Sequence, residues 1–324
     1  MNFARALSSL AAMGVAISCS AWAETSGKCP MSGKYTIAVH GGYVADELPD
    51  WPDAAVKKLT YEITSRARSR LAAGASALDV VVEAIAAFED SGQTDAGKGA
   101  FQNTAGFTET DASLMIGSSG RSGAVAAMQK LKNPIIAARI VMEKTPHVLF
   151  VGPAGEQTLI GLGAVPVTDP KSYFQPVKEP LSMRSHTHGT VGAVALDQCG
   201  VLAAGTSTGG TYGKLPGRVG DTPIIGASTF ANEQVAFSAT GAGEFFIKRG
   251  ATRDIAARVE YLHWPLKKAA DYVIKELIGH VDHARGAIIA ISRSGEIVFS
   301  STGYGLLHGF ADQSTPAVVA VRAD

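Results

Sequence analysis

The chain has 324 residues, of which 46% are hydrophobic and 18% charged, a length and composition that suit one large domain or two small ones around a sizeable core. Its 29 basic and 29 acidic residues give a formal net charge of zero. Because no basic stripe is present, we do not expect nucleic acid as a partner. No segment after the first 23 residues is long and apolar enough to span a bilayer.

The first residues, 1–23, have the pattern of a secretory signal peptide. Arg5 supplies the positive end, residues 6–15 form a short apolar run, and residues 21–23 (Ala-Trp-Ala) match a small-x-small cleavage site. We therefore expect export, to the periplasm or beyond, with no membrane attachment after cleavage. The mature chain would begin near Glu24.

The three cysteines leave two interpretations open. Lipidation of Cys19 is disfavoured, because residues 16–18 lack the leucine usual three positions before a lipidated cysteine. An oxidising compartment would permit a disulfide between Cys29 and Cys199, and two unpaired small residues explain the pattern equally well. Neither cysteine has zinc-ligand spacing or a catalytic signature.

The first half of the mature chain predicts strands and helices in blocks. A β-branched run at residues 35–39 predicts a buried strand that ends in a turn at residues 40–42, His-Gly-Gly. Helical periodicity predicts two helices within residues 51–91, broken at Gly74 and restarted by a cap at Ser76. The other segments expected here are a loop at 95–106, strands at 112–115, 123–128 and 147–151, and helices from Pro134 (capped by Asn133) to about 143 and at 155–162.

Residues 170–189 differ in character from both halves. They carry three prolines, three serines and several charges without an apolar period, which is typical of a linker. His186 and His188 have no carboxylate or cysteine cluster nearby, so we do not expect a metal site.

Beyond the linker, the pattern is again typical of sheet and helix. The expected segments are strands at 190–196 and 201–204 around a turn at 197–200, a strand at 235–240, helices at 243–248, 253–262 and 265–278, a hairpin of 287–292 and 296–301, and an edge strand at 318–321. Strands and helices come in blocks instead of alternating, which predicts stacked sheets covered by helices and argues against a Rossmann-type sheet.

Thr190 is the first candidate catalytic residue, because it lies on the border between the polar linker and an apolar strand. A cut before Thr190 would leave a free amine and a hydroxyl on one residue. The α-amino group titrates at roughly pH 8 and can take the hydroxyl proton, so one residue serves as nucleophile and base. An ordinary strand that starts with threonine is the alternative, and this stretch alone favours it.

Three further stretches could form a site with Thr190. Residues 205–210 place hydroxyl and N–H groups at a strand end. In residues 214–221, the guanidinium of Arg218 can pair with the carboxylate of an amino acid, and Asp221 with its ammonium. At residues 240–244 a strand gives way to a helix, whose free N–H groups can stabilise an oxyanion. Taken singly, each stretch is also explained as a turn or a solvated loop.

Together these stretches resemble the isoaspartyl peptidase/L-asparaginase family, the plant-type asparaginases among the N-terminal nucleophile hydrolases. The residues that carry the resemblance are 189–197 (Gly-Thr-Val-Gly-Ala-Val-Ala-Leu-Asp), 206–210 (Thr-Ser-Thr-Gly-Gly), 216–221 (Pro-Gly-Arg-Val-Gly-Asp) and 240–244 (Thr-Gly-Ala-Gly-Glu). Residues 111–115 and 132–149 are also similar to family segments. The sequence His188-Gly189-Thr190 favours this branch over the glycosylasparaginases, in which the residue before the nucleophile is usually aspartate.

The resemblance implies an α/β (α+β) fold, a four-layer αββα sandwich. It implies autocatalytic cleavage between Gly189 and Thr190 into an α subunit (24–189, ending in the linker 170–189) and a β subunit (190–324), which form one composite domain and pair into an (αβ)₂ assembly. It also implies a small-molecule or dipeptide substrate, no cofactor for catalysis, and a structural sodium or potassium ion as the metal to consider.

Residue by residue, the resemblance makes Thr190 the nucleophile and Thr208 the neighbour that tunes its hydroxyl. Thr240 and Gly241 would form the oxyanion hole. The substrate-binding positions implied are Arg218, Val219, Gly220, Asp221, Thr240, Gly241, Ala242 and Gly243. Thr190 would attack the side-chain carbonyl of a β-aspartyl peptide or L-asparagine, and water would then release L-aspartate.

Three positions depart from the family pattern. Tyr43 follows His-Gly-Gly where the family has alanine, Asp95 replaces an asparagine that lies near the nucleophile, and Ile116 replaces an aspartate. These departures keep two alternatives open. One is a poorly processed or inactive relative that only binds aspartyl compounds. The other is an enzyme for a glycosylated asparagine, with a pocket reshaped by Tyr43.

Overall fold

The computed structural model describes residues 31, 33–44, 52–177, 187–281, 284–303 and 305–322. The predicted signal peptide, Cys29 and His186 lie outside these residues. The larger sheet has the strand order β13-β12-β1-β6-β7-β2-β3-β4, with β5 paired to β1. Its strands are β1 (Thr36–Val44), β2 (Thr110–Ile116), β3 (Ser122–Met128), β4 (Leu149–Val151), β5 (Thr187–His188), β6 (Val191–Leu196), β7 (Leu202–Thr208), β12 (Gly305–Asp312) and β13 (Val318–Ala320).

The smaller sheet has the order β11-β10-β9-β8. Its strands are β8 (Phe230–Ala231), β9 (Val235–Gly241), β10 (Gly286–Ser292) and β11 (Ile297–Ser301). The helices are α1 (Ala54–Ala72), α2 (Ala77–Ser91), η1 (Gly97–Gly99), α3 (Pro134–Lys144), α4 (Gly152–Gly161), α5 (Pro170–Tyr173), α6 (Gly243–Arg249), α7 (Ala251–Leu262), α8 (Leu266–Asp271) and the π-helix η3 (Tyr272–Ile278).

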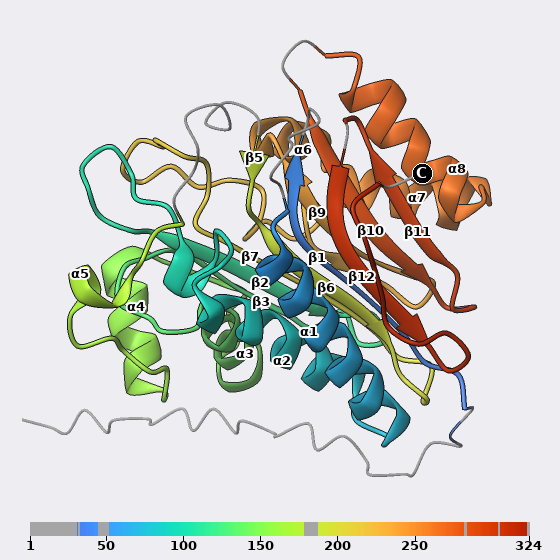
Figure 1. Cartoon of the computed structure of the whole chain (residues 1–324), viewed down its shortest axis with the longest axis horizontal. Coiled ribbons are helices and arrows are strands. Elements are labelled where there is room, and N and C mark those ends of the chain that lie inside the picture. Colours follow the sequence, from blue (N-terminus) through green and yellow to red (C-terminus); the bar gives the residue numbers. More distant parts are fainter. Residues whose placement is uncertain are drawn as a thin grey trace, which may run out of the picture. The chain divides into compact units, whose positions relative to one another are not determined.

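The two sheets pack face to face, with β1, β6 and β7 against β9 and β10. Helices α1, α2 and α3 cover the outer face of the larger sheet, and α7, α8 and η3 cover the smaller one (Figure 1). The predicted αββα sandwich is confirmed. None of the helices in the described residues has the length and apolar character needed to cross a membrane.

Strand β6 shows how alternation orients the site. Val191, Ala193 and Ala195 pack toward the helices, whereas Val194 and Leu196 pack between the sheets. Successive side chains of a strand point to opposite faces. Thr190 precedes the strand and has the parity of Val194, so its side chain is directed between the two sheets.

Two segments differ from the sequence predictions. Strand β1 does not end at residues 40–42 but runs on to Val44, because a register irregularity between His40 and Gly42 absorbs the extra residue. The partner that makes this possible is β12, which was not predicted. The helix expected at 265–278 is α8 followed by a π-helical stretch.

The ends of the predicted linker contain regular structure. Residues 170–173 form α5, and β5 pairs with Tyr43 and Val44 of β1. Residues 178–186 lie outside the described part. At the turn after β6, Cys199 is disulfide-bonded, so the unpaired interpretation is wrong for this cysteine.

Glu89 shows a cap that the sequence did not reveal. Asn133 occupies the N-cap position of α3, but its side chain makes no capping hydrogen bond and donates to Asp90 instead. The buried carboxyl of Glu89 accepts from Ile135 N at 3.0 Å and from Ser207 Oγ at 2.7 Å. Glu89 therefore joins α2, α3 and β7.

Burial raises the pKa of Glu89 to about 8, which predicts a loss of stability at alkaline pH. The unfolded carboxyl loses its proton near pH 4.5, whereas the folded one keeps it to about pH 8. Stability is therefore lost as pH rises through this window, by about 1.4 kcal/mol per unit at most. Urea unfolding at pH 5 and pH 8 should show this loss in the wild type and a smaller one in Glu89→Gln. Equal slopes in both proteins would contradict the assignment.

Candidate active site

Thr190 and Thr208 form the centre of the site. Thr190 is 8% exposed, and its Oγ1 lies 3.0 Å from Thr208 Oγ1. Thr208 ends β7, and its hydroxyl accepts a hydrogen bond from Gly210 N at 2.9 Å. Since one lone pair of Thr208 already receives this N–H, its own proton is available to Thr190, where it can stabilise developing negative charge on Oγ1.

Gly189, on the other side of the predicted cut, packs against Asp95. A Cβ at position 189 would lie 2.4 Å from Asp95 Cβ and 2.9 Å from its N, so only glycine fits there. Asp95 also contacts the residue after Thr208, because its main-chain carbonyl accepts a hydrogen bond from Gly209 N at 2.9 Å. Its Oδ1 accepts from Phe101 N at 2.8 Å. Asp95 therefore lies between the residue before Thr190 and the residue after Thr208.

Arg218 and Asp221 come together as the predicted clamp. A Cβ at Gly243 would lie 2.6 Å from Asp221 Oδ1 and 3.2 Å from Arg218 Nη2, which places both charged groups against the start of α6. Arg218 Nε and Nη2 lie 3.0 and 2.9 Å from Glu244 Oε1. Burial raises the pKa of Asp221 to about 6, with Arg218 opposing the shift. Asp221 Oδ2 has no hydrogen-bond partner in the described chain, so it can accept from an ammonium group.

Thr240 and Gly241 end β9, and Thr240 has the parity of Ala236, which packs between the sheets. Thr240 is 1% exposed, and its Oγ1 has no partner among the described residues. Gly241 has φ +146, and a Cβ there would lie 2.4 Å from Arg285 O, so glycine is required. Ala242 N donates to Arg285 O, so this N–H is not available to an oxyanion. The free hydroxyl of Thr240 is thus the donor suited to an oxyanion.

Comparison with known proteins decides the family. The sequence model of the asparaginase family matches residues 33–321. The chain belongs to this family. The isoaspartyl peptidase of Escherichia coli K12 is 37% identical over 319 residues, which cover 90% of this chain and 98% of that protein. The isoaspartyl peptidase/L-asparaginase of Homo sapiens is 37% identical over 274 residues, covering 81% and 88%.

Membership of the asparaginase family confirms the resemblance inferred from the motifs. The motif residues fall into two contacting groups, Thr190 with Thr208, and Arg218 with Asp221 and Gly243. The remaining implied positions, Val219, Gly220, Thr240, Gly241 and Ala242, lie in the adjoining loop and at the end of β9.

Sequence reasoning missed the residues that hold the clamp loop in place. The buried Lys214 donates from Nζ to Glu109 O at 2.8 Å, and the Glu109 carboxylate accepts from Gly217 N at 3.1 Å and from Asn103 Nδ2 at 2.8 Å. Glu244 belongs to the motif at residues 240–244, but the sequence pattern predicted no function for it. Its place directly after Gly243 is the signal that could have identified it.

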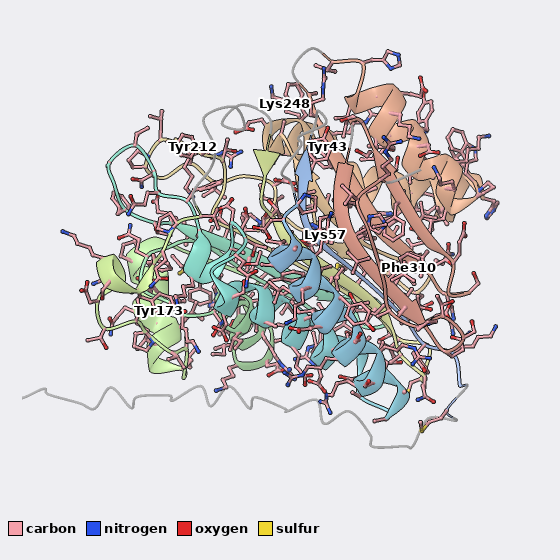
Figure 2. All side chains as sticks on the ribbon, viewed as in Figure 1. Tyr43, Lys57, Tyr173, Tyr212, Lys248 and Phe310 are labelled. Carbon is pink, nitrogen blue, oxygen red and sulfur yellow. The ribbon has the colours of Figure 1, made fainter. Side chains whose placement is uncertain are left out.

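Tyr43, one of the departures from the family pattern, is a core residue. It is fully buried in the core between the sheets, and its hydroxyl lies 2.9 Å from Thr302 Oγ1. Figure 2 shows Tyr43 at the end of β1 near β5. The idea that Tyr43 reshapes a pocket for a glycosylated asparagine stays a prediction, which the substrate comparison below tests.

The sequence raised a metal ion in two connections, the histidine pair His186 and His188 and a structural sodium or potassium ion. In the described residues no group of three or more histidine, cysteine or acidic side chains could hold an ion, and His186 lies outside them. An alkali-metal ion in the loop at residues 92–99 would need main-chain carbonyls. Those of Thr94, Ala96 and Lys98 each accept one hydrogen bond, from Ala96 N, Gly99 N and Gln175 N. A carbonyl oxygen has a second lone pair, so these hydrogen bonds do not exclude an ion, and the ion stays a prediction.

Proposed function

We propose that this chain is a threonine-nucleophile amidohydrolase that cuts itself between Gly189 and Thr190. It would then hydrolyse β-aspartyl dipeptides and L-asparagine to release L-aspartate. The observation that carries the proposal is the 3.0 Å contact of Thr190 Oγ1 with Thr208 Oγ1. Thr190 directly follows Gly189, and the chain also contains the Arg218–Asp221 pair. The names of the relatives from Escherichia coli and Homo sapiens support the substrate class.

The mechanism assigns one step to each group. The free amine of Thr190 takes the proton of Oγ1, which attacks the side-chain carbonyl of the aspartyl unit. Thr240 and Gly241 stabilise the oxyanion, while Arg218 and Asp221 hold the α-carboxylate and α-ammonium. The amine or ammonia leaves with the proton, and water hydrolyses the ester to regenerate Thr190.

The decisive experiment is intact mass spectrometry of the purified protein after a day of incubation. A chain that begins at Thr190 is the expected result, and the end of the first chain is free to be trimmed. Rates on β-Asp-Leu, L-asparagine and an N-glycosyl-asparagine then define the substrate. One uncut chain without activity would favour a binding relative, and a preference for the glycosyl substrate would overturn the substrate class.

Asp95 leads to a prediction about pH dependence. Its Cβ and main chain pack against Gly189, and its Oδ1 lies against Gly209, the residue after Thr208. The amine released by cleavage therefore forms near this carboxylate and is favoured in the protonated, unreactive form. Asp95→Asn should therefore move the acid limb of the kcat/KM profile to lower pH by about 1–3 units. Asp90→Asn, an exposed carboxylate next to the same segment, is the control. Identical profiles for Asp95→Asn and wild type would contradict this role.

We further propose export directed by residues 1–23, assembly as (αβ)₂, and a structural alkali-metal ion. The disulfide at Cys199 supports export, because disulfides persist in oxidising compartments. N-terminal sequencing of the exported protein, its mass in solution by light scattering, and unfolding in sodium, potassium and choline buffers test the three points.

A further inference from the structure

Thr190 lies beyond the hydrogen-bonded ladders that hold β6. The last β1–β6 pair is His40 with Gly192, and the last β6–β7 pair is Val191 with Ser207. The proposed cut would make residue 190 a chain end, and chain ends are poorly ordered unless tied down. Because a reacting group must be held within about 0.5 Å, contacts other than strand pairing have to fix Thr190.

His40 is placed to provide such a contact. It is fully buried on β1, and its Nε2 lies 2.9 Å from Ser238 Oγ on β9. A Cβ at Gly192 would lie 1.9 Å from Ser238 Oγ and 2.4 Å from His40 Nε2, so glycine at this position lets the two side chains meet over β6. Burial lowers the pKa of His40 to about 3, so the ring is neutral and carries one proton.

A row of buried hydroxyls determines which ring nitrogen carries that proton. Thr229 Oγ1 donates to Thr206 Oγ1 at 2.6 Å, and Thr206 Oγ1 lies 2.7 Å from Ser238 Oγ. In the described part of the chain Ser238 is the acceptor left for the proton of Thr206. The proton of Ser238 then points to His40 Nε2. Nε2 is therefore the acceptor, and the neutral ring has its proton on Nδ1.

The Nδ1–H group lies close to Thr190 in the sheet, because His40 pairs with Gly192, two residues after Thr190. Nδ1 has no hydrogen-bond partner among the described residues, and the main chain of Thr190 is the neighbour that favours a proton on the ring. The acceptor of a main chain is its carbonyl oxygen. We propose that His40 is a positioning residue for Thr190, whose carbonyl it holds through Nδ1–H once the chain has been cut.

This inference rests on the proposed function and explains how Thr190 keeps its place as a chain end. The row of hydroxyls runs from Thr229 to His40 and holds the ring so that Nδ1–H cannot turn away. The nucleophile then stays beside Thr208 without a covalent link to Gly189.

Two substitutions at His40 separate the ring nitrogens. Asparagine places an amide donor where Nδ1 was, whereas glutamine places one where Nε2 was. His40→Gln should lower kcat for β-Asp-Leu by about tenfold to a hundredfold, with KM unchanged within about twofold because the clamp is intact. His40→Asn should retain most of kcat. Loss of kcat in both variants, or in neither, would overturn the proposal.

A second measurement does not depend on activity or on the variants folding. Long-range ¹H–¹⁵N correlation of the histidine rings in the mature wild type should show His40 protonated on Nδ1 and not on Nε2. The reverse tautomer would overturn the proposal. Failure of the proposed function has a different signature, a wild type that hydrolyses none of the three substrates whatever the tautomer of His40.

Discussion

Thr190→Ala should remain a single chain and should lose at least about a thousandfold of the activity on β-Asp-Leu. Both effects have one cause, because the Oγ1 that attacks the substrate is also the group that attacks the Gly189 carbonyl. Thr208 cannot replace it, since its oxygen accepts from Gly210 N and its residue carries no free amine after cleavage. Intact mass and the rate of L-aspartate release measure the two effects in the same sample.

Thr190→Ser is the matched control for the alanine variant. Serine retains the hydroxyl 3.0 Å from Thr208 but loses the methyl group that restricts its rotation. We expect it to cut itself more slowly than the wild type and to keep measurable activity. A Thr190→Ala protein that is both processed and active would refute the nucleophile assignment, whatever the behaviour of the serine variant.

Local sequence patterns were sufficient to predict those strands and helices whose hydrophobic residues recur with a regular period within one segment. Strands β6, β7 and β9 and helices α1 and α2 lie where the sequence predicted them. Strand β12 has no such pattern, because Gly305 and Gly309 interrupt its apolar residues. It is specified by pairing with β1, for example Thr36 with Asp312, and a contact across so much of the chain leaves no mark on local periodicity.

The same limit applies to the site. Motifs located Thr190, Thr208, Arg218 and Asp221, because these residues lie in short stretches of fixed spacing. The groups that hold them come from distant segments. His40 is 150 positions before Thr190 in the sequence, and Glu109 is 108 positions before Gly217, through which it supports the clamp loop. Glu89 replaces Asn133 as the cap of α3 for the same reason.

Arg218→Ala should leave self-cleavage intact and raise KM for β-Asp-Leu by about a hundredfold. The precursor has no free aspartyl carboxylate, so the guanidinium has no role in the cut. In the mature enzyme Arg218 provides the positive charge for the substrate α-carboxylate. It lies against Glu244 on one edge, which leaves Nη1 for the ligand. Truncating one partner of a buried charge pair costs about 2–5 kcal/mol, and a hundredfold corresponds to about 2.7 kcal/mol, in the lower half of that range.

The loss of kcat/KM should be larger than for an arginine without acidic neighbours, because two acidic side chains remain at the clamp. Without Arg218, the carboxyl groups of Glu244 and Asp221 remain beside the incoming carboxylate, so repulsion adds to the lost hydrogen bonds. Arg249→Ala is the control, because Arg249 lies on α6, the helix that carries Glu244, and pairs with Asp254 at 2.8 Å. Steady-state kinetics of both variants measure the difference. If Arg218→Ala keeps the wild-type kcat/KM, or loses it no more than Arg249→Ala does, the carboxylate is bound by other residues and the clamp assignment fails.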